Sequence, residues 1–350
     1  MSNQATILLV GLLCTCGTNA DNASECRTWR DVNINDSMVA WATHHEVSGF
    51  HPMNVISSIA GPHRSKQNGI FNNTILVTTG NQAYGALADQ WEKHASSLGY
   101  KWLFVALDDL TLFQREPFLC TAHIDYLLTG RYFFQEDSKE RIYGNVNFNT
   151  LTANKLRIVL ALLERGYDVV FSDPDNFILQ DIFDEGSELH SLVKSGYDYI
   201  YSVDRSGNPK LSTLQREDIM NACKTKEEPY GNTGFYFARG GSKVVRNMFQ
   251  NSIEMTSLHG KYDDQSAFWR VLSQNANRRH CNKEQDHAAV GNAEVLRFCC
   301  LDPRKFVAGR ENPIANKHDL MTYHANWVWG IQNKITKLKR NGIWDVKTSF

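Results

Sequence analysis

Residues 166–175 read Gly-Tyr-Asp-Val-Val-Phe-Ser-Asp-Pro-Asp, a short apolar run that leads into a turn with two carboxylates. The β-branched and aromatic residues at 169–171 predict a buried strand. Ahead of the glycine, apolar residues recur at helical spacing from Leu156 to Leu163 and predict a helix with one apolar face. A helix, a glycine and a buried strand in this order indicate an α/β domain.

The same alternation of helices and strands continues on both sides. We predict strands over residues 75–79, 102–107, 168–173, 197–203 and 235–238, and helices over 83–98, 156–163, 242–255 and 264–274. This order predicts the α/β class, with a Rossmann-like, mostly parallel sheet flanked by helices in a single large domain. Ligands bind such sheets at the carboxyl ends of the strands, which directs attention to residues 79–81, 108–109 and 173–175.

The composition is that of a globular protein without a charge bias. Of the 350 residues 42% are hydrophobic and 21% charged, and 37 basic against 38 acidic side chains give a net charge of -1. This balance disfavours a general nucleic-acid binder, which carries a basic excess. The sequence contains no GxGxxG, GxxxxGKS/T or GxSxG motif, so a dehydrogenase, a P-loop NTPase and an α/β-hydrolase each lack their defining motif.

The N-terminal residues have the pattern of a targeting segment. An apolar run over residues 7–17 is followed by Thr18-Asn19-Ala20, whose small residues suit cleavage before Asp21. We expect a signal peptide over residues 1–20, although no Lys or Arg precedes the run; a truncated anchor and a cytosolic start are the alternatives. No stretch reaches the roughly 20 apolar residues that cross a bilayer, so no stable membrane span is expected. Residues 21–71 are expected to form a stem or pre-domain, and residues 72–350 the main domain.

Cysteine and sequon usage favours the secretory pathway, with the Golgi lumen or secretion as the destination. Cys14 and Cys16 lie in the apolar leader, and the remaining cysteines are Cys26, Cys120, Cys223, Cys281, Cys299 and Cys300. This even set without CxxC spacing predicts disulfides rather than a zinc site, with the connectivity open. Because neighbouring strand residues point to opposite faces, Cys299 and Cys300 need different partners. Three N-glycosylation sequons begin at Asn22, Asn35 and Asn72.

Asp173 and Asp175 are the sharpest chemical feature of the sequence. Two carboxylates one residue apart, on a turn just after a strand, can both reach one divalent cation, and Pro174 restricts the turn. Such oxygen ligands suit Mn²⁺ or Mg²⁺, usually with substrate phosphates completing the shell. The alternative is a plain turn, because Asp-Pro is itself a turn signal.

Residues 166–175 resemble the central motif of the nucleotide-diphospho-sugar transferase family, within glycosyltransferase family 77, which includes plant rhamnogalacturonan xylosyltransferases. Further similar motifs follow in order over residues 74–344. They are Lys155, Leu179-Gln180-Asp181-Ile182-Phe183 with Ile182 in place of the usual proline, Asn232-Thr233-Gly234-Phe235, Asp264-Gln265, His324-Ala325-Asn326 with Gly330, Lys334-Ile335 and Gly342-Ile343-Trp344.

The resemblance implies a GT-A fold, a nucleotide-sugar donor, metal dependence and retention of anomeric configuration. Asp173 and Asp175 would hold the cation, with His324 as the third ligand. Lys155 and Lys334 would face the diphosphate together with Asp173, although the family usually carries its lysine where this chain has Ile331.

The resemblance also places the donor and the acceptor. The nucleotide would lie near Thr78, Thr79 and Asn81, and Asp108 would accept a bond from a ribose hydroxyl. The catalytic residues would be Asn232 and the Asp264-Gln265 pair, which line the donor sugar and the acceptor. Two alternatives stay open. The sequence does not decide which of Asp263 and Asp264 faces the site, and the acid at this position could instead simply cap the helix that follows. Trp327-Val328-Trp329 either stacks on a sugar ring or packs on the sheet.

We therefore expect a metal-dependent glycosyltransferase that moves a sugar from a UDP-sugar to a glycan or glycoprotein acceptor. UDP-xylose and UDP-galactose are the leading donors. The competing functions are a metal-dependent phosphodiesterase or nucleotidase, for which the single Asp-x-Asp and one late histidine offer few ligands, and an inactive secreted carbohydrate-binding protein.

Overall fold

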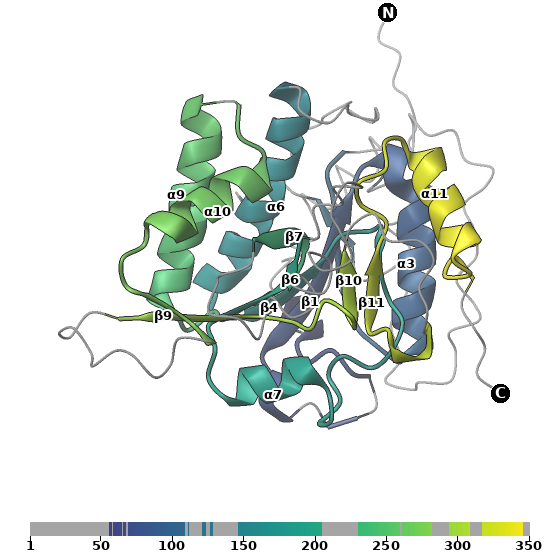
Figure 1. Ribbon diagram of the computed structural model, residues 1–350, viewed down its shortest axis with the longest axis horizontal. Coiled ribbons are helices and arrows are strands. Elements are labelled where there is room, and N and C mark those ends of the chain that lie inside the picture. The colour runs from purple at the N-terminus through teal and green to yellow at the C-terminus, as the bar shows by residue number, and fades with distance from the viewer. Residues whose placement is uncertain are drawn as a thin grey trace, which may run out of the picture. The chain divides into compact units, whose positions relative to one another are not determined.

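A mixed sheet lies at the centre of the computed structural model (Figure 1). Among the residues that the structure describes, it contains eight strands in the order β3-β2-β1-β4-β7-β6-β9-β8. The strands are β1 (Thr74–Gly80), β2 (Leu103–Ala106), β3 (Thr121–His123), β4 (Asp168–Ser172), β6 (Tyr199–Val203), β7 (Gly231–Ala238), β8 (Arg278–His280) and β9 (Leu296–Cys300). The five strands that were expected from the sequence are all present.

The structure describes residues 56–57, 59–64, 66–67, 69–108, 111, 121–123, 127–128, 146–204, 230–259, 261–281, 294–308 and 317–345. The described residues belong to one unit that spans Ser48–Phe350. Several sequence-based expectations fall outside them: the signal peptide over 1–20, the sequons at Asn22 and Asn35, Asp109, and the cysteines Cys14, Cys16, Cys26, Cys120 and Cys223.

The strand directions confirm the α/β class with a mostly parallel sheet. Five of the seven described pairings in this sheet are parallel, including β1 with β2 and β1 with β4. The exception is β7, which runs antiparallel to both β4 and β6. Every residue of β1 is buried, as expected for a strand covered on both faces.

Two groups of helices flank the sheet (Figure 1). The first group, on the left of the view, is α6 (Val146–Glu164), α9 (Lys243–His259) and α10 (Asp264–Gln274), which pack on one another. The second, on the right, is α3 (Gly85–Ser97) and α11 (Ile331–Arg340). The short elements are η1 (Gly69–Phe71), η2 (Gln82–Tyr84), α7 (Glu188–Lys194) and η5 (Lys317–Asp319).

A second, three-stranded sheet brings the C-terminal part of the chain to the end of β4. Its order is β10 (Phe306–Ala308), β11 (Thr322–His324) and β5 (Asn176–Ile178). β11 pairs antiparallel with β5, so His324 lies opposite Asn176, directly after the Asp173–Asp175 turn. None of these three-residue strands was predicted, because a run of three residues shows no usable periodicity.

The described residues between Gly61 and Phe71, expected as the end of a stem, belong to the same unit. The Gly61 amide donates to the Thr74 carbonyl at 3.0 Å, and the Arg64 amide donates to the Gly99 carbonyl at 2.9 Å. Phe71 is 1% exposed and contacts the ring of Phe183. The segment is therefore built into the edge of the α/β unit by backbone pairing and an aromatic contact.

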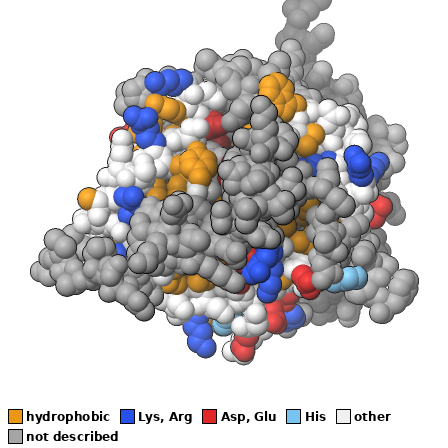
Figure 2. Space-filling model, viewed as in Figure 1, with side chains coloured by type: hydrophobic (Ala, Val, Ile, Leu, Met, Phe, Trp, Pro, Cys, Tyr) orange, Lys and Arg blue, Asp and Glu red, His pale blue; other side chains and the backbone are white. Residues whose placement is uncertain are grey.

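The described helices and the face drawn in Figure 2 bear on the question of a membrane span and on the charge balance. No helix among the described residues is both long and apolar enough to cross a bilayer. On the face in Figure 2, blue and red side chains are interspersed over the described part, in keeping with the net charge of -1.

A disulfide joins Cys281, just after β8, to Cys299 in β9. The adjacent Cys300 is disulfide-bonded as well, so the two neighbouring cysteines have different partners, as expected. The bridge closes a loop with a sequence separation of 18.

Replacing Cys281 and Cys299 together with serine is expected to lower the free energy of unfolding by about 3 kcal/mol, because the bridge limits the unfolded chain. Urea denaturation of the parent and of the double variant measures this difference. An unchanged midpoint and slope would show that the bridge contributes nothing to stability.

Candidate metal and donor site

The two carboxylates of the Asp-x-Asp motif lie on a tight turn between β4 and β5. The turn is held by backbone bonds: the Asp173 amide donates to the Gly234 carbonyl at 2.8 Å, and the Asn176 amide donates to the Asp173 carbonyl at 2.9 Å. The hydroxyl of Ser172 donates to the Asn176 carbonyl at 2.9 Å. None of these bonds uses the carboxylate of Asp173 or Asp175, so both carboxylates face the site.

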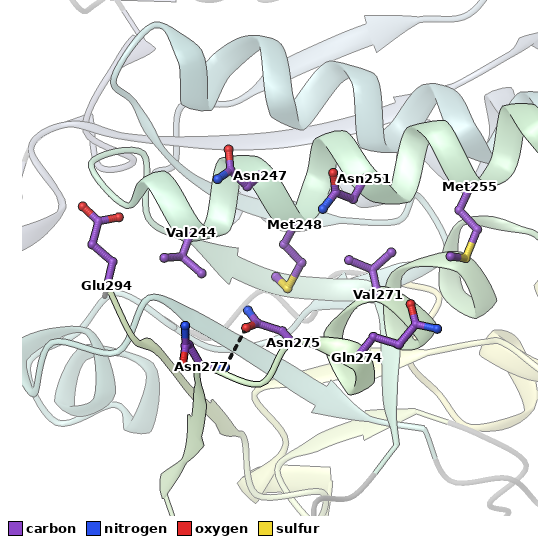
Figure 3. Close-up of a pocket in the computed structure, with 10 residues that line it drawn as sticks. All are labelled: Val244, Asn247, Met248, Asn251, Met255, Val271, Gln274, Asn275, Asn277 and Glu294. Carbon is purple, nitrogen blue, oxygen red and sulfur yellow. Dashed lines mark hydrogen bonds between the residues drawn. The ribbon is translucent and has the colours of Figure 1, made fainter. Parts of the chain in front are cut away.

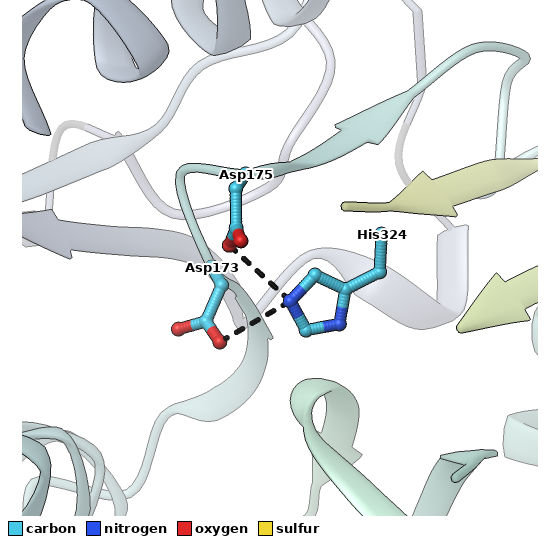
Figure 4. A group of neighbouring side chains, drawn as sticks. All are labelled: Asp173, Asp175 and His324. Atoms are coloured by element: carbon cyan, nitrogen blue, oxygen red, sulfur yellow. Dashed lines mark ion pairs between the residues drawn. The ribbon is translucent and has the colours of Figure 1, made fainter. Parts of the chain in front are cut away.

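Asp173, Asp175 and His324 converge as the sequence predicted (Figure 4). The Nε2 atom of His324 lies 3.2 Å from Asp175 Oδ1 and 3.7 Å from Asp173 Oδ2. One ligand atom from each of the three residues lies within 4.8 Å of the others. Asp175 and His324 are 2% and 4% exposed, so the group is shielded from bulk water.

Gly234 in β7 makes room for the imidazole. A Cβ atom at this position would lie 2.2 Å from His324 Cε1 and 2.7 Å from both His324 Nδ1 and Asn232 Oδ1. Asn232 in turn fixes the ring, because its Oδ1 lies 3.0 Å from His324 Nδ1. With one ring nitrogen held by an amide oxygen, the Nε2 atom is directed at the carboxylates.

Two partly buried lysines, Lys155 and Lys334, neutralise part of the negative charge. Lys155 Nζ lies 3.1 Å from Asp173 Oδ1 and 3.0 Å from Asp264 Oδ2. Burial by itself lowers the pKa of Lys155, but Asp173 and Asp264 outweigh it and the net pKa is raised. Lys334 in α11 forms an ion pair with Asp175 Oδ2. Burial acts to raise the pKa of Asp175, but Lys334 and His324 hold it well below the usual range.

Replacing Lys155 with methionine is expected to destabilise the metal-free protein by about 3–5 kcal/mol, because it leaves the Asp173 and Asp264 carboxylates buried without their cation. Added Mn²⁺ is expected to restore part of this loss. The measurement is thermal unfolding with Mn²⁺ and with EDTA. Lys243→Met, which removes an exposed lysine from α9, is the control, with an expected change below about 0.5 kcal/mol.

The N-terminus of α10 separates the roles of two neighbouring acids. Asp263 is the cap, since its side chain accepts a bond from the Ser266 amide at 2.7 Å. Asp264 is buried and faces the site, where it accepts from the hydroxyl of Thr233 at 2.8 Å as well as pairing with Lys155. The alternative left open by the sequence is thus decided in favour of Asp263 as the cap.

The candidate metal ligands Asp173, Asp175 and His324 form what we call the metal group. Gln265 connects this group to the carboxylate of Asp204, which was not predicted from the sequence. Its Oε1 accepts a bond from Asn232 Nδ2 at 3.1 Å, and its Nε2 donates to Asp204 Oδ2 at 3.0 Å. Burial raises the pKa of Asp204, against the effect of its bonds from Trp327 and Gln265. Asp204 directly follows β6, and the rule that drew attention to Asp108 and Asp173 at strand ends applies equally here.

The residues predicted to contact the nucleotide lie together at the carboxyl ends of β1 and β2. Thr78 is fully buried, and its hydroxyl has no hydrogen-bond partner among the described residues. The hydroxyl of Thr79 donates to the Val105 carbonyl at 2.7 Å, and Asn81 is 2% exposed. Asp108 is fully buried and accepts bonds from the amides of Gln82 and Thr111. In this arrangement Thr79 and Asp108 stabilise the strand ends, and their contact with a nucleotide stays a prediction.

The donor set fits a divalent cation. Two carboxylates and one imidazole are ligands that Mn²⁺ and Mg²⁺ accept, and the three groups already converge from β4–β5 and β11. The two lysines show that the negative charge is costly to leave unpaired in this buried position. The residues present therefore match the metal site expected from the sequence.

A cavity of about 370 Å³ lies elsewhere, between α9 and α10 (Figure 3). Its floor is apolar, with Met248 and Val271, and its rim carries amide side chains such as Asn247 and Asn251. It shares no residue with the metal group, and it contains no cluster of titratable side chains. The converging charges, rather than this cavity, mark the candidate site.

The chain belongs to the nucleotide-diphospho-sugar transferase family, which it matches over residues 98–338. This family membership, together with the mostly parallel sheet and the Asp-x-Asp turn, assigns the fold to the expected GT-A type.

Individual relatives are distant. The chain is 22% identical over 295 residues to the β-arabinofuranosyltransferase RAY1 of Arabidopsis thaliana, covering 80% of this chain and 49% of that protein. It is 24% identical over 208 residues to a UDP-galactose:fucoside α-3-galactosyltransferase of Dictyostelium discoideum, covering 58% and 29%. The chain thus spans half or less of the length of these relatives. A solved structure of the galactosyltransferase LgtC matches with a TM-score of 0.32 and 14% identity, covering 66% of this chain and 74% of that one.

Proposed function

We propose that this protein is a metal-dependent glycosyltransferase that moves a sugar from a UDP-sugar to a hydroxyl of a glycan or glycoprotein, with retention of configuration. The observation that carries the proposal is the convergence of Asp173, Asp175 and His324 in a chain of the nucleotide-diphospho-sugar transferase family. Two carboxylates and an imidazole next to two lysines form a site for a cation and a diphosphate together.

Each residue of the site has a role in this proposal. Asp173, Asp175 and His324 would hold Mn²⁺ or Mg²⁺, and such a cation stabilises the negative charge that develops on a leaving diphosphate. Lys334, whose ammonium already lies at Asp175, adds a second positive charge for the same phosphates. Lys155 holds Asp173 and Asp264 in place through its two ion pairs.

Asn232 and Gln265 act next to the metal group. Asn232 orients the imidazole of His324, and its own amide is held by Gln265. Gln265 is in turn fixed by Asp204 and by the Thr233 amide, so the side chains of Asn232 and Gln265 form a rigid polar surface next to the donor sugar. Asp264 stabilises this surface through its contacts with Thr233 and Lys155.

The finer assignments are also proposals. The ordered motifs support membership in glycosyltransferase family 77, close to the rhamnogalacturonan xylosyltransferases. UDP-xylose and UDP-galactose are the leading donors; the relative from D. discoideum is named for UDP-galactose and the one from A. thaliana for arabinofuranosyl transfer.

The apolar leader, the sequons and the disulfides support a protein of the secretory pathway, in the Golgi lumen or secreted, with residues 1–20 as its signal peptide and 72–350 as its GT-A domain.

A panel of UDP-sugars, assayed with Mn²⁺ and with EDTA, tests the activity. We expect one donor to be consumed in the presence of Mn²⁺ and none in EDTA, and NMR of the product to show the donor's anomeric configuration. Release of UMP together with a sugar phosphate would indicate a phosphodiesterase. Glycan binding without donor consumption would indicate a carbohydrate-binding protein.

Calorimetric titration with UDP and GDP, both with Mn²⁺, tests the nucleotide. UDP is expected to bind more tightly, because the family resemblance implies a uridine site at the ends of β1 and β2, where Thr78, Thr79 and Asp108 lie. Tighter binding of GDP would contradict the UDP assignment.

A further inference from the structure

Exposed aromatic side chains gather beside the donor site. Among the described residues, four large hydrophobic side chains are exposed: Ile70 by 40%, Tyr230 by 47%, Trp327 by 43% and Trp329 by 72%. Of these, Tyr230 and Trp327 both bond to the same residue, Asp204, although they are far apart in the sequence. Exposed apolar side chains scattered singly need no explanation. These two differ, because Trp327 is held at Asp204 through its indole and Tyr230 through its backbone carbonyl.

Trp327 is held in a conformation that its residue type disfavours. Its φ is 58°, the only positive value of a non-glycine residue in the described part of the chain. Its indole Nε1 donates to Asp204 Oδ1 at 2.9 Å. A bulky residue with positive φ costs free energy, and such positions cluster at functional sites. The bond to Asp204 fixes the indole while leaving its ring partly exposed.

Tyr230 is held by a backbone bond with Asp204 and by packing on Trp269. Its carbonyl accepts a bond from the Asp204 amide at 2.9 Å, and its ring packs against Trp269 with the centroids 5.3 Å apart. The next residue, Gly231, is closely packed, since a Cβ there would lie 2.1 Å from Trp269. Tyr230 is therefore supported by its contact with Trp269 and remains about half exposed.

A chain of hydrogen bonds connects this aromatic pair to the metal group. Asp204 accepts from Gln265 at 3.0 Å, Gln265 accepts from Asn232 at 3.1 Å, and Asn232 lies 3.0 Å from the His324 ring. Four consecutive contacts thus lead from Trp327 to a metal ligand. The indole of Trp327 therefore belongs to the same hydrogen-bond network as the candidate metal site.

We propose that Tyr230 and Trp327 form the acceptor subsite, and that they bind a sugar ring of a glycan acceptor. This inference rests on the proposed function and names its acceptor class. A sugar ring presents an apolar face of C–H groups, which packs on aromatic surfaces, and hydroxyls at its edge, which bond to polar groups such as Asp204 and Gln265. Trp327 and Tyr230 bind the ring, and Asp204 is a positioning residue for Trp327 and Gln265.

Saturation-transfer NMR on the full chain, with UDP and Mn²⁺ present, tests the subsite. The probes are the methyl glycosides of fucose, galactose, xylose and arabinofuranose, and a serine-rich peptide for comparison. We expect saturation transfer to at least one glycoside and none to the peptide. Trp327→Ala and Tyr230→Ala are each expected to raise the Kd of that glycoside about tenfold, and Trp327→Phe, which keeps an aromatic ring, by less.

Ile70→Ala is the matched control, because it removes an equally exposed apolar side chain at the opposite, amino-terminal end of β1. Its Kd is expected to equal that of the parent. Binding of UDP with Mn²⁺ reports that each variant is folded. Equal glycoside affinity in the parent and both alanine variants, binding of the peptide alone, or no glycoside binding by a parent that binds UDP would each overturn the subsite. A parent that binds a glycoside through these two rings but not UDP would overturn the proposed function and leave the subsite standing.

Discussion

Asp175→Asn is expected to lower kcat/KM by roughly a thousandfold, which corresponds to about 4 kcal/mol of transition-state stabilisation. The substitution keeps the size of the side chain but removes the charge that pairs with Lys334 and faces His324. A neutral amide oxygen is a far weaker ligand for a divalent cation than a carboxylate. The measurement is initial rates over a range of Mn²⁺ concentrations, with calorimetry of Mn²⁺ binding beside it.

Two controls make this result specific. EDTA should abolish transfer by the parent, and Mn²⁺ should restore it. Glu185→Gln, which removes one negative charge from an exposed position before α7, should leave the rate unchanged. Full activity of the parent in EDTA would overturn the metal assignment.

Gly234→Ala is expected to cost at least a hundredfold in activity. The new methyl group would lie 2.2 Å from the His324 ring, so the imidazole or β7 must move. Overpacking of this kind typically costs about 1–3 kcal/mol of stability. Displacing a ligand of a metal centre lowers metal affinity and activity by more than the loss of stability alone would suggest. Activity and Mn²⁺ affinity are measured together, and both are expected to fall.

Gly241→Ala is the matched control, because a Cβ at Gly241 meets no atom within 4 Å. It follows the same strand, β7, and should leave both quantities unchanged. If Gly234→Ala keeps the Mn²⁺ affinity of the parent, then His324 does not need its present position and is not a ligand.

The strongly patterned elements could be predicted from the sequence. The apolar run ending at Ser172 forms β4, and α10 has the predicted bounds, Asp264–Gln274. The direction of β7 could not be predicted, because burial on both faces leaves the same apolar pattern in parallel and antiparallel strands. β10, β11 and β5 were missed because three residues are too few for a period.

The candidate metal ligands were predictable from the sequence, whereas the role of Lys334 was less so. Asp173, Asp175 and His324 were found from motifs, and the structure brings them together. Lys334 was uncertain because Ile331 occupies the position where the family usually has lysine. Residues three apart lie on the same face of a helix, so a lysine one turn later in α11 still reaches Asp175.

Asp204 and Trp327 show what a linear reading leaves out. Their bond joins residues 123 positions apart, and no local pattern specifies it. Asp108 follows a strand as expected, but the amides of Gln82 and Thr111, which donate to its carboxylate, were not predicted. Position at a strand end is predictable, whereas the partner of each side chain depends on tertiary packing.

The small sheet β10-β11-β5 attaches one candidate metal ligand to the site through short strands. Its middle strand carries His324 but contains only three residues, and the helix with Lys334 follows it. Segments with few backbone bonds open at lower free energy than the core. A transient release of β11 would withdraw the imidazole while the eight-stranded sheet stays closed. The amides of Thr322–His324 should therefore exchange with deuterium faster than those of β4, and on warming the enzyme should inactivate before it unfolds.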